Sequence, residues 1–349
     1  MELTIIRLSQ AVQLLYAELL QQVSMALPGQ RGVSFSTKSV SNKKYWYMEV
    51  VVGSGKKQYS LGRDTQELRA LIEKQKMLYK QAAPDIKQRE KLVSMLVAGG
   101  LYVPNSSDGR VLELLSQSGV FLSGGVLVGS HAFNVYQGML GVEWDTELIQ
   151  TQDIDLASEK QINLAIREDA PDVKSVLLDS EMGFFEVPAL NVKSPSTSFK
   201  IRGQLFHVDL LTPLLGSDNS TPVKLKHFKS YAHPVRFLDF LLDDAQIGVI
   251  PFRAGVLVNV PSPVRFAFHK LVISQRRPAA QHTKAKKDMM QAEMLLKVLL
   301  EDRPGDIGLI CDELDNMPEK FQQQLKQGMS NLSKNIQDRL LEYAYFNME

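Results

Sequence analysis

Cysteine is almost absent from this sequence of 349 residues. The single thiol, Cys311, excludes an internal disulfide and any zinc site built from several cysteines. Because Cys311 follows Leu309 and Ile310, we expect it to be a small buried residue. One unpaired cysteine is consistent with a reducing compartment, and we expect a cytoplasmic protein.

Long apolar runs are also absent, since no stretch approaches the ~20 apolar residues that span a bilayer. The N-terminal segment differs from a secretion signal because Glu2, Arg7 and Glu18 interrupt its apolar residues at helical spacing. This spacing predicts an amphipathic helix over residues 3–23. We therefore expect no membrane segment and no membrane partner.

Neither sign of charge is in excess, because 40 Lys and Arg residues face 39 Asp and Glu residues. The net charge of +1 therefore decides nothing about nucleic acid binding, and any electrostatic argument must be local. A composition of 44% hydrophobic and 23% charged residues is ordinary for a globular protein. At ~100–200 residues per domain, the length allows two or three domains.

Aromatic and basic residues alternate near the N-terminus. Two β-rich runs, residues 44–52 and 58–61, flank Gly53-Ser54-Gly55 and predict a hairpin. The candidate nucleic acid contacts in and beside these runs are Lys43, Lys44, Trp46, Lys56 and Lys57. Cations interleaved with aromatic rings can bind phosphates and stacked bases. The alternative is a solvated hairpin whose lysines discourage edge-to-edge aggregation.

Helical patterns follow this hairpin. Residues 66–81 predict one helix, and a second is expected over residues 86–97 because Pro84 should break the pattern between them. The sequence PNSSDG at residues 104–109 is rich in turn-forming residues and predicts a linker.

The most informative stretch runs from Ser123 to Leu156. A glycine-rich turn ends in Gly129-Ser130, whose backbone N–H groups and hydroxyl could hold phosphates. Farther on, Asp153 and Asp155 stand two residues apart in a predicted strand, so their side chains project from the same face. Carboxylates held this close repel unless a cation lies between them, and a divalent metal is the usual partner.

A third carboxylate, Asp209, lies inside the apolar run Phe206–Leu211. A charge in such a run is costly unless it is paired or bound to metal. A site with two metal ions needs a third carboxylate, because Asp153 and Asp155 alone would hold the second ion poorly. Alone, Asp209 would be interpreted as a buried hydrogen-bonded residue, but the upstream motifs favour metal binding.

The order of these motifs resembles the DNA polymerase β-like nucleotidyltransferase superfamily and, within it, a largely uncharacterised bacterial branch. The resemblance spans roughly residues 119–300. It rests on Gly124-Gly125, Gly129-Ser130, Asp153-Ile154-Asp155, Asp209, Val260–Pro263, His269-Lys270-Leu271, Arg276-Arg277 and Lys287-Asp288. The sequence departs from compact members in that Asp153 lies 23 residues beyond Ser130, which lengthens the predicted loop at residues 141–151 into a candidate substrate loop.

The resemblance implies a chemistry. Asp153, Asp155 and Asp209 would bind two Mg²⁺ ions, for which Mn²⁺ could substitute, and Asp209 would help to activate an acceptor hydroxyl. Gly129 and Ser130 would hold the phosphates of a nucleoside triphosphate such as ATP. The reaction would transfer a nucleoside monophosphate to the acceptor and release pyrophosphate.

A basic segment follows at residues 265–288, with seven Lys or Arg residues and one acid. Lys270, Arg276 and Arg277 are the candidate phosphate contacts, by their charge and their place in the family-like motif. A solvated helical face is an equal alternative for Lys284, Lys286 and Lys287. We expect Asp288 to pair with one of these cations and His269 to be structural.

The expected fold class is α+β. It comprises a small mixed nucleotidyltransferase sheet flanked by helices, an N-terminal region of helices and a β-hairpin, and an all-helical C-terminal domain. The predicted domain boundaries are residues 1–104, 105–262 and 263–349.

The acceptor remains open at this point. RNA (including a tRNA end), a protein hydroxyl and a small molecule are the alternatives, and the basic hairpin favours nucleic acid. Two further interpretations are a non-catalytic nucleotide- or nucleic-acid-binding protein and a nucleotidyltransferase of a toxin or defence system. The presence of all three carboxylates argues against a degenerate site.

Overall fold

The computed structural model describes residues 5–26, 33–40, 43–52, 55–149, 151, 153–159, 171–189, 194–217 and 220–343. Its strands are β1 (Ile6–Arg7), β2 (Val33–Val40), β3 (Lys43–Val52), β4 (Gly55–Arg63), β5 (Val126–Val128), β6 (Val142–Glu143), β7 (Asp153–Ala157), β8 (Phe184–Glu186), β9 (Ser198–Ile201), β10 (His207–Pro213), β11 (Val223–Leu225), β12 (Ser230–Val235), β13 (Gln246–Ile250) and β14 (Val256–Val260). Its α-helices are α1 (Gln10–Ser24), α2 (Gln66–Ala98), α3 (Ser106–Gln117), α4 (Gly129–Leu140), α5 (Thr146–Ile149), α6 (Val173–Leu178), α7 (Leu238–Leu242), α8 (Pro263–Arg276), α9 (His282–Asp302), α10 (Pro304–Leu314), α11 (Glu319–Ser330) and α12 (Lys334–Leu341).

A mixed sheet of seven strands forms the centre of the molecule. Its main path runs β11-β12-β10-β7-β5, and β9 joins the edge of β10 and pairs with β8. Strand β10 is parallel to both β7 and β12. It accommodates β9 as well because β9 pairs with residues 207–209, whereas β12 pairs with residues 211–213. The predicted mixed sheet is confirmed.

Helix α4 connects this sheet to the rest of the core. It follows β5 directly and contacts β7 on one side and the β13–β14 hairpin on the other. Its interior residues Phe133 and Tyr136 are fully buried, and the Tyr136 ring meets the Phe266 ring of α8 edge to face at 5.3 Å. Helix α4 therefore links the sheet to the C-terminal helices.

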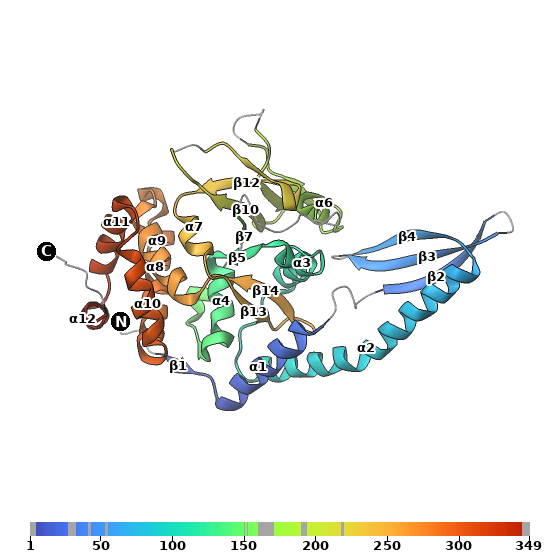
Figure 1. Ribbon diagram of the computed structural model, residues 1–349, viewed down its shortest axis with the longest axis horizontal. Helices are drawn as coiled ribbons and strands as arrows, with labels where there is room; N and C mark the ends of the chain where they lie inside the picture. Colours follow the sequence, from blue (N-terminus) through green and yellow to red (C-terminus); the bar gives the residue numbers. More distant parts are fainter. Residues whose placement is uncertain are drawn as a thin grey trace.

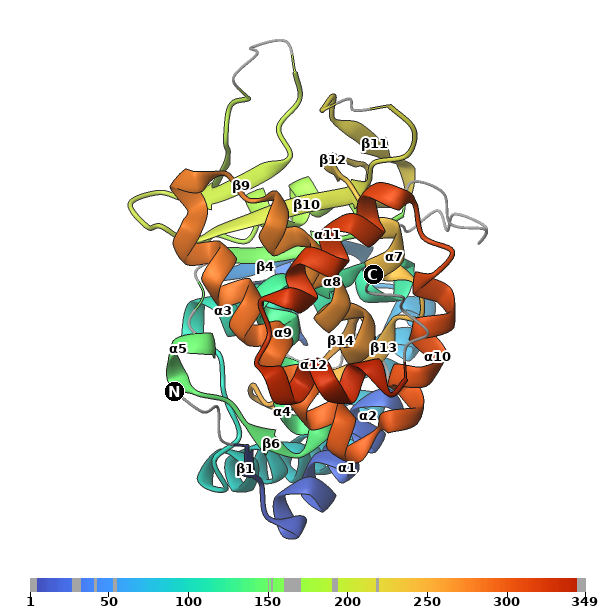
Figure 2. The same ribbon diagram turned by 90° about the vertical axis from the view of Figure 1, so that its left-hand side faces the viewer.

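The C-terminal helices α8–α12 gather at one end of the molecule (Figure 1). From the side, α8, α9 and α11 stand in front of part of the sheet, and α12 lies lower, in front of α4 (Figure 2). Cys311 on α10 is 4% exposed, as expected, and burial raises its pKa to about 11. The predicted α+β class with a helical C-terminal region is confirmed. Among the described residues, no helix combines the length and the apolar composition that crossing a membrane requires.

The first helix begins later than the apolar pattern predicts. Ile6 and Arg7 form β1 and pair with β6, and α1 begins only at Gln10, where the Ser9 hydroxyl accepts a hydrogen bond from the Val12 N–H. Strand β6 and helix α5 also lie within the segment expected to be a loop at residues 141–151. Strands β1 and β6 lie far apart in the sequence, and their pairing gives both a structure that local sequence patterns do not encode.

Two boundaries predicted from turn-forming residues are wrong. Helix α2 runs through Pro84 without ending, because Lys80 and Pro84 are both exposed and water can hydrate the carbonyl that proline leaves unpaired. The PNSSDG sequence is the start of α3, since Asn105 Oδ1 accepts hydrogen bonds from the N–H groups of Ser107 and Asp108. Asparagine favours a helix N-cap as well as a turn, so its presence did not distinguish the two.

Strands β2, β3 and β4 form a separate antiparallel sheet. It confirms the predicted hairpin, to which β2 adds a third strand. The sheet lies along the N-terminal part of α2, and together they project from the body as an arm, opposite the C-terminal helices (Figure 1). The C-terminal part of α2 anchors the arm, because Leu92, Val93 and Leu96 pack with α1 in a buried apolar cluster.

Candidate functional site

The three predicted carboxylates come together on two neighbouring parallel strands. In the register of β7 and β10, Asp153 lies opposite His207 and Asp155 lies opposite Asp209. Paired residues in a sheet share a face, and residues two apart along a strand do as well. Asp153, Asp155 and Asp209 therefore project from one face of the sheet, together with His207.

The His207 imidazole lies between two of these carboxylates. Its Nδ1 atom is 3.0 Å from Asp153 Oδ1, and its Nε2 atom is 3.3 Å from Asp209 Oδ2. The hydrogen bond with Asp209 is the largest cause that raises the pKa of His207, to about 9. Sequence reasoning missed His207, although its place two residues before Asp209 in a strand was a usable signal.

The two paired carboxylates differ in their electrostatics. The pKa of Asp155 is raised to about 6, mainly by burial and secondarily by the neighbouring charges of Asp209 and Asp153. Burial also raises the pKa of Asp209, but hydrogen bonds with His207 and Ser198 outweigh it, and the net pKa is lowered. The carboxylate of Asp155 is therefore the one that most lacks a cation.

Gly129 stands directly against Asp155. It has φ +66°, and a Cβ added there would lie 2.2 Å from Asp155 Oδ2. Only glycine fits, both because the backbone is left-handed and because the carboxylate fills the space of a side chain. Helix α4 begins at this residue, and its N-cap residue, Val128, makes no side-chain cap. The first turn of α4 thus opens beside the carboxylates with N–H groups that can bind an anion.

A cleft of about 1260 Å³ connects these features. Gly129, Ser130, Asp153, Asp155 and His207 line one side of it. The other side is basic and comes from α8 and α9, with a loop residue between them: it contains Lys270, Arg277, Lys284 and Lys287. The cleft therefore places an acidic strand edge opposite a basic helical wall.

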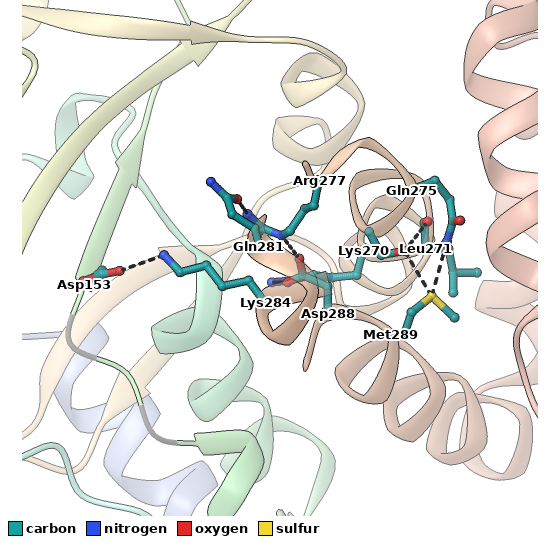
Figure 3. Close-up of polar contacts among 10 residues, drawn as sticks. Asp153, Lys270, Leu271, Gln275, Arg277, Gln281, Lys284, Asp288 and Met289 are labelled. Atoms are coloured by element: carbon teal, nitrogen blue, oxygen red, sulfur yellow. Dashed lines mark hydrogen bonds and ion pairs between the residues drawn. The ribbon is translucent and has the colours of Figure 1, made fainter. Parts of the chain in front are cut away.

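Asp288 fixes two of the basic groups. It is 3% exposed, and its Oδ1 and Oδ2 atoms each lie 2.5 Å from a cation, Lys270 Nζ and Arg277 Nε respectively (Figure 3). Burial raises the pKa of Asp288, but the charges of Lys270 and Arg277 outweigh it and lower the net pKa. Asp288 was expected to pair with one cation, and it pairs with two. Its carboxylate holds both Lys270 and Arg277 at the cleft.

Helix α9 adds two further lysines. Lys284 extends toward the strands, with its Nζ atom 3.7 Å from Asp153 Oδ2 (Figure 3). Burial lowers the pKa of Lys287 to about 8, with a smaller contribution from the charge of Lys270. Lys286 is exposed and does not line the cleft. Each of the two alternatives for these three lysines therefore holds for part of the run. Lys284 and Lys287 face the cleft, whereas Lys286 lies on a solvated surface.

The sequence neighbours of Lys270 and Arg277 differ in their surroundings, since His269 also lines the cleft and Arg276 does not. The Arg276 guanidinium lies 5.3 Å from the Phe237 ring centroid and 3.5 Å from Gln324. His269 is 5% exposed, and burial lowers its pKa to about 3. His269 is therefore neutral at pH 7, in keeping with the structural role expected for it.

The acidic side has the chemistry that Mg²⁺ prefers, because carboxylate oxygens are hard ligands. Within the described part of the chain, however, no three His, Cys, Asp or Glu side chains are arranged so that they could hold a metal ion as they stand. The imidazole of His207 lies between Asp153 and Asp209, where it supplies positive charge. Metal binding by all three carboxylates would therefore require His207 to move.

The residues predicted to contact nucleic acid lie in the arm, and they divide between the two faces of its sheet. Trp46 faces α2, with its Nε1–H donating to Asp64 and Lys76 above its ring, and Lys44 shares that face by strand alternation. Lys43 and Lys56 are exposed and lie on the opposite face. The Lys57 side chain lies outside the part that the structure describes.

In comparison with protein families, the family model described as nucleotidyltransferase matches residues 106–313. This range includes Asp153, Asp155, Asp209 and the basic residues of α8 and α9 that line the cleft. Comparisons with curated proteins and with solved structures gave no match. The family match extends over more than half of the 349 residues. The chain therefore belongs to the nucleotidyltransferase family, whose members transfer a nucleotidyl group from a nucleotide substrate.

Proposed function

We propose that the cleft binds a nucleoside triphosphate with Mg²⁺ and transfers its nucleoside monophosphate to an acceptor hydroxyl, with release of pyrophosphate. One observation carries the proposal. Asp153 and Asp155 face a basic wall across a single cleft, beside a helix N-terminus at Gly129, and Asp209 is the direct neighbour of Asp155 on the adjacent strand. Such a site offers acidic groups for metal ions and basic groups for phosphates.

Asp153, Asp155 and Asp209 would hold the metal, with two Mg²⁺ ions as the expected number and Mn²⁺ as a substitute. When bound, the metal would neutralise the triphosphate and increase the acidity of the acceptor hydroxyl. The high pKa of Asp155, about 6, supports this assignment, because it records a carboxylate whose negative charge lacks sufficient compensation.

The protein's own groups would position the phosphates. The N–H groups at the start of α4 and the Ser130 hydroxyl would donate hydrogen bonds to the β- and γ-phosphates. Across the cleft, Lys284 and Lys287 would add positive charge, together with Lys270 and Arg277. Because Asp288 already holds the last two cations in place, little reorganisation would be needed when the negative charge of the substrate arrives.

The size of the cleft supports a second substrate. Pockets for small ligands usually enclose about 300–1,000 Å³. The volume here, about 1260 Å³, leaves room for an acceptor group beside the nucleotide. Ile149 and Thr151, from the lengthened segment between Ser130 and Asp153, line the same cleft. This placement supports the role expected for that segment in substrate binding.

A transfer assay tests the proposal. The protein is incubated with Mg²⁺ and each α-labelled nucleoside triphosphate, with RNA, protein and small hydroxyl compounds as acceptors. We expect label to pass from at least one nucleotide to one acceptor class, and Asp153→Asn plus Asp155→Asn to abolish the transfer. Asp338→Asn on α12, which removes an exposed carboxylate, is the matched control and should transfer normally. Absence of transfer to every acceptor, or equal transfer by the double variant, would reject the proposal.

A further inference from the structure

The arm sheet has an open face that its packing does not use. We call this face the outer face and define it by six residues. They are Lys38, Lys43, Tyr45, Tyr47, Lys56 and Arg63. The four cations are exposed and the two tyrosines are half-buried.

Strand register and side-chain contacts place these residues together. Tyr45 pairs with Lys38 on β2 and with Arg63 on β4, and paired residues share a face. Lys38 Nζ lies 5.1 Å from the Tyr47 ring centroid, which places Tyr47 on the same face. Strand alternation adds Lys43 on β3, and Lys56 shares the face because it pairs with Val51 on that strand.

The opposite face of the sheet accounts for the stability of the arm. Phe35 meets Tyr79 of α2 with 6.2 Å between ring centroids, and Lys76 of α2 lies 5.0 Å from the Trp46 ring centroid. Ile72 of α2 is 2% exposed. The core of the arm is therefore built without Tyr45 or Tyr47, whose half-buried rings lie on the outer face among its cations.

The charge of the arm limits the kind of partner. The arm together with the anchoring part of α2, residues 33–98, contains thirteen Lys and Arg residues against six Asp and Glu residues, a formal charge of +7. Since the whole chain has a charge of +1, the remainder has a charge of −6. A long polyanion would therefore be attracted more strongly to the arm than to the remainder of the chain taken as a whole.

The aromatic rings limit the partner further. Bases can stack on tyrosine rings, and the surrounding cations can bind the phosphates of the same strand. Stacking requires bases that are not already enclosed in a duplex. The arm also projects away from the body, so a long strand can reach its sheet (Figure 1). An acidic protein would satisfy the cations but would have no comparable use for two adjacent rings.

We propose that the outer face of the arm binds single-stranded nucleic acid. Tyr45 and Tyr47 stack with bases, while Lys38, Lys43, Lys56 and Arg63 contact phosphates. The proposal goes beyond nucleotidyl transfer at the cleft. It does not rest on the proposed function, because binding at the arm needs neither the metal nor the nucleotide of the cleft.

The binding test uses the full chain and a fluorescent single-stranded RNA of 20 nucleotides, measured by anisotropy in EDTA without nucleotide. Wild type should bind, and Tyr45→Ala plus Tyr47→Ala should weaken binding about 10-fold or more through lost stacking. Tyr45→Phe plus Tyr47→Phe should restore binding, because phenylalanine keeps the ring. Replacing the four cations by Gln should weaken binding and reduce the salt slope by about 0.7 per lost phosphate contact.

A matched control removes charge elsewhere. Lys320→Gln plus Lys334→Gln, on exposed parts of α11 and α12, should leave RNA binding unchanged. The proposal is overturned if wild type does not bind the RNA, if the alanine and cation variants bind as wild type does, or if duplex RNA binds as tightly as the single strand. Because the measurement excludes metal and nucleotide, its failure is distinct from a failure of transfer at the cleft.

Discussion

Asp209 and Asp155 are direct neighbours across the parallel strands β10 and β7. This relationship joins two parts of the chain that are more than fifty positions apart and turns a pair of carboxylates into a group of three. Their proximity raises the pKa of Asp155, after the larger effect of burial. The consequences of this arrangement for stability, binding and catalysis can be measured separately.

The crowded carboxylates should destabilise the metal-free protein. The pKa of Asp155 is raised from 3.8 to about 6, so ionisation costs the folded state free energy once the pH exceeds 3.8. We expect Asp155→Asn to raise the free energy of unfolding by about 1–3 kcal/mol at pH 8 in EDTA. The gain should disappear below pH ~4, where the wild-type carboxyl is protonated in both states. Denaturant unfolding at both pH values measures this difference, and a variant that is no more stable than wild type at pH 8 contradicts it.

Gly129 should tolerate no side chain. Gly129→Ala would introduce a left-handed alanine and a Cβ 2.2 Å from Asp155 Oδ2, so we expect a loss of about 2–4 kcal/mol in unfolding free energy together with a loss of transfer. Gly183→Ala is the matched control, because Gly183 has φ +82° but no atom within 4 Å of an added Cβ. The control should show only the backbone strain, ~1–2 kcal/mol. Equal losses for both variants would mean that the contact with Asp155 has no energetic weight.

The three neighbouring lysines of α9 should differ in their effect on nucleotide binding. Lys284→Gln and Lys287→Gln remove charges that line the cleft, and each should weaken binding of a nucleoside triphosphate about 5- to 20-fold. Lys286→Gln removes the same charge from an exposed position outside the cleft and should have no effect. Calorimetric titration with a non-hydrolysable analogue measures the three affinities. A comparable loss for Lys286→Gln would show that only the overall charge of the helix matters.

The buried carboxylate of Asp288 gives a second pH dependence, of opposite sign. Its pKa lies below 3.8 in the folded state because Lys270 and Arg277 outweigh the effect of burial. Its stabilisation is therefore complete above pH ~4 and is lost as the pH falls through the folded-state pKa. We expect Asp288→Asn to lose about 3 kcal/mol at pH 7, since two cations lose their partner. The difference from wild type should stay constant between pH 5 and pH 8 and narrow below pH ~4; a difference that widens on acidification would refute this account.

The sequence was most informative where chemistry and strand periodicity coincide. Asp153 and Asp155 two positions apart, and an isolated Asp209 in an apolar run, predicted one face of one sheet. The same rule applied to His207 would have placed it beside Asp209. Local sequence patterns carry no information about pairing between distant strands, and for this reason β1 and β6 were not predicted.

The direction in which a helical side chain points was harder to predict from the sequence. Arg276 and Arg277 are adjacent, yet one packs on Phe237 and the other pairs with Asp288. Which side of α9 meets the cleft depends on how α8 and α9 pack, and the sequence of a basic run does not specify this packing. Pro84 was misleading for a related reason: whether a proline ends a helix depends on the solvation of the carbonyl that it leaves unpaired.

The most direct measurement is the transfer rate of Asp209→Asn, because Asp209 is the carboxylate on which the proposed transfer chemistry depends. The assay follows label from an α-labelled nucleoside triphosphate to the acceptor found for wild type, with Asp338→Asn as the control. We predict a loss of at least ~100-fold in rate, with the fold retained by circular dichroism. A rate equal to that of wild type would make Asp209 a structural residue and would contradict the proposed site.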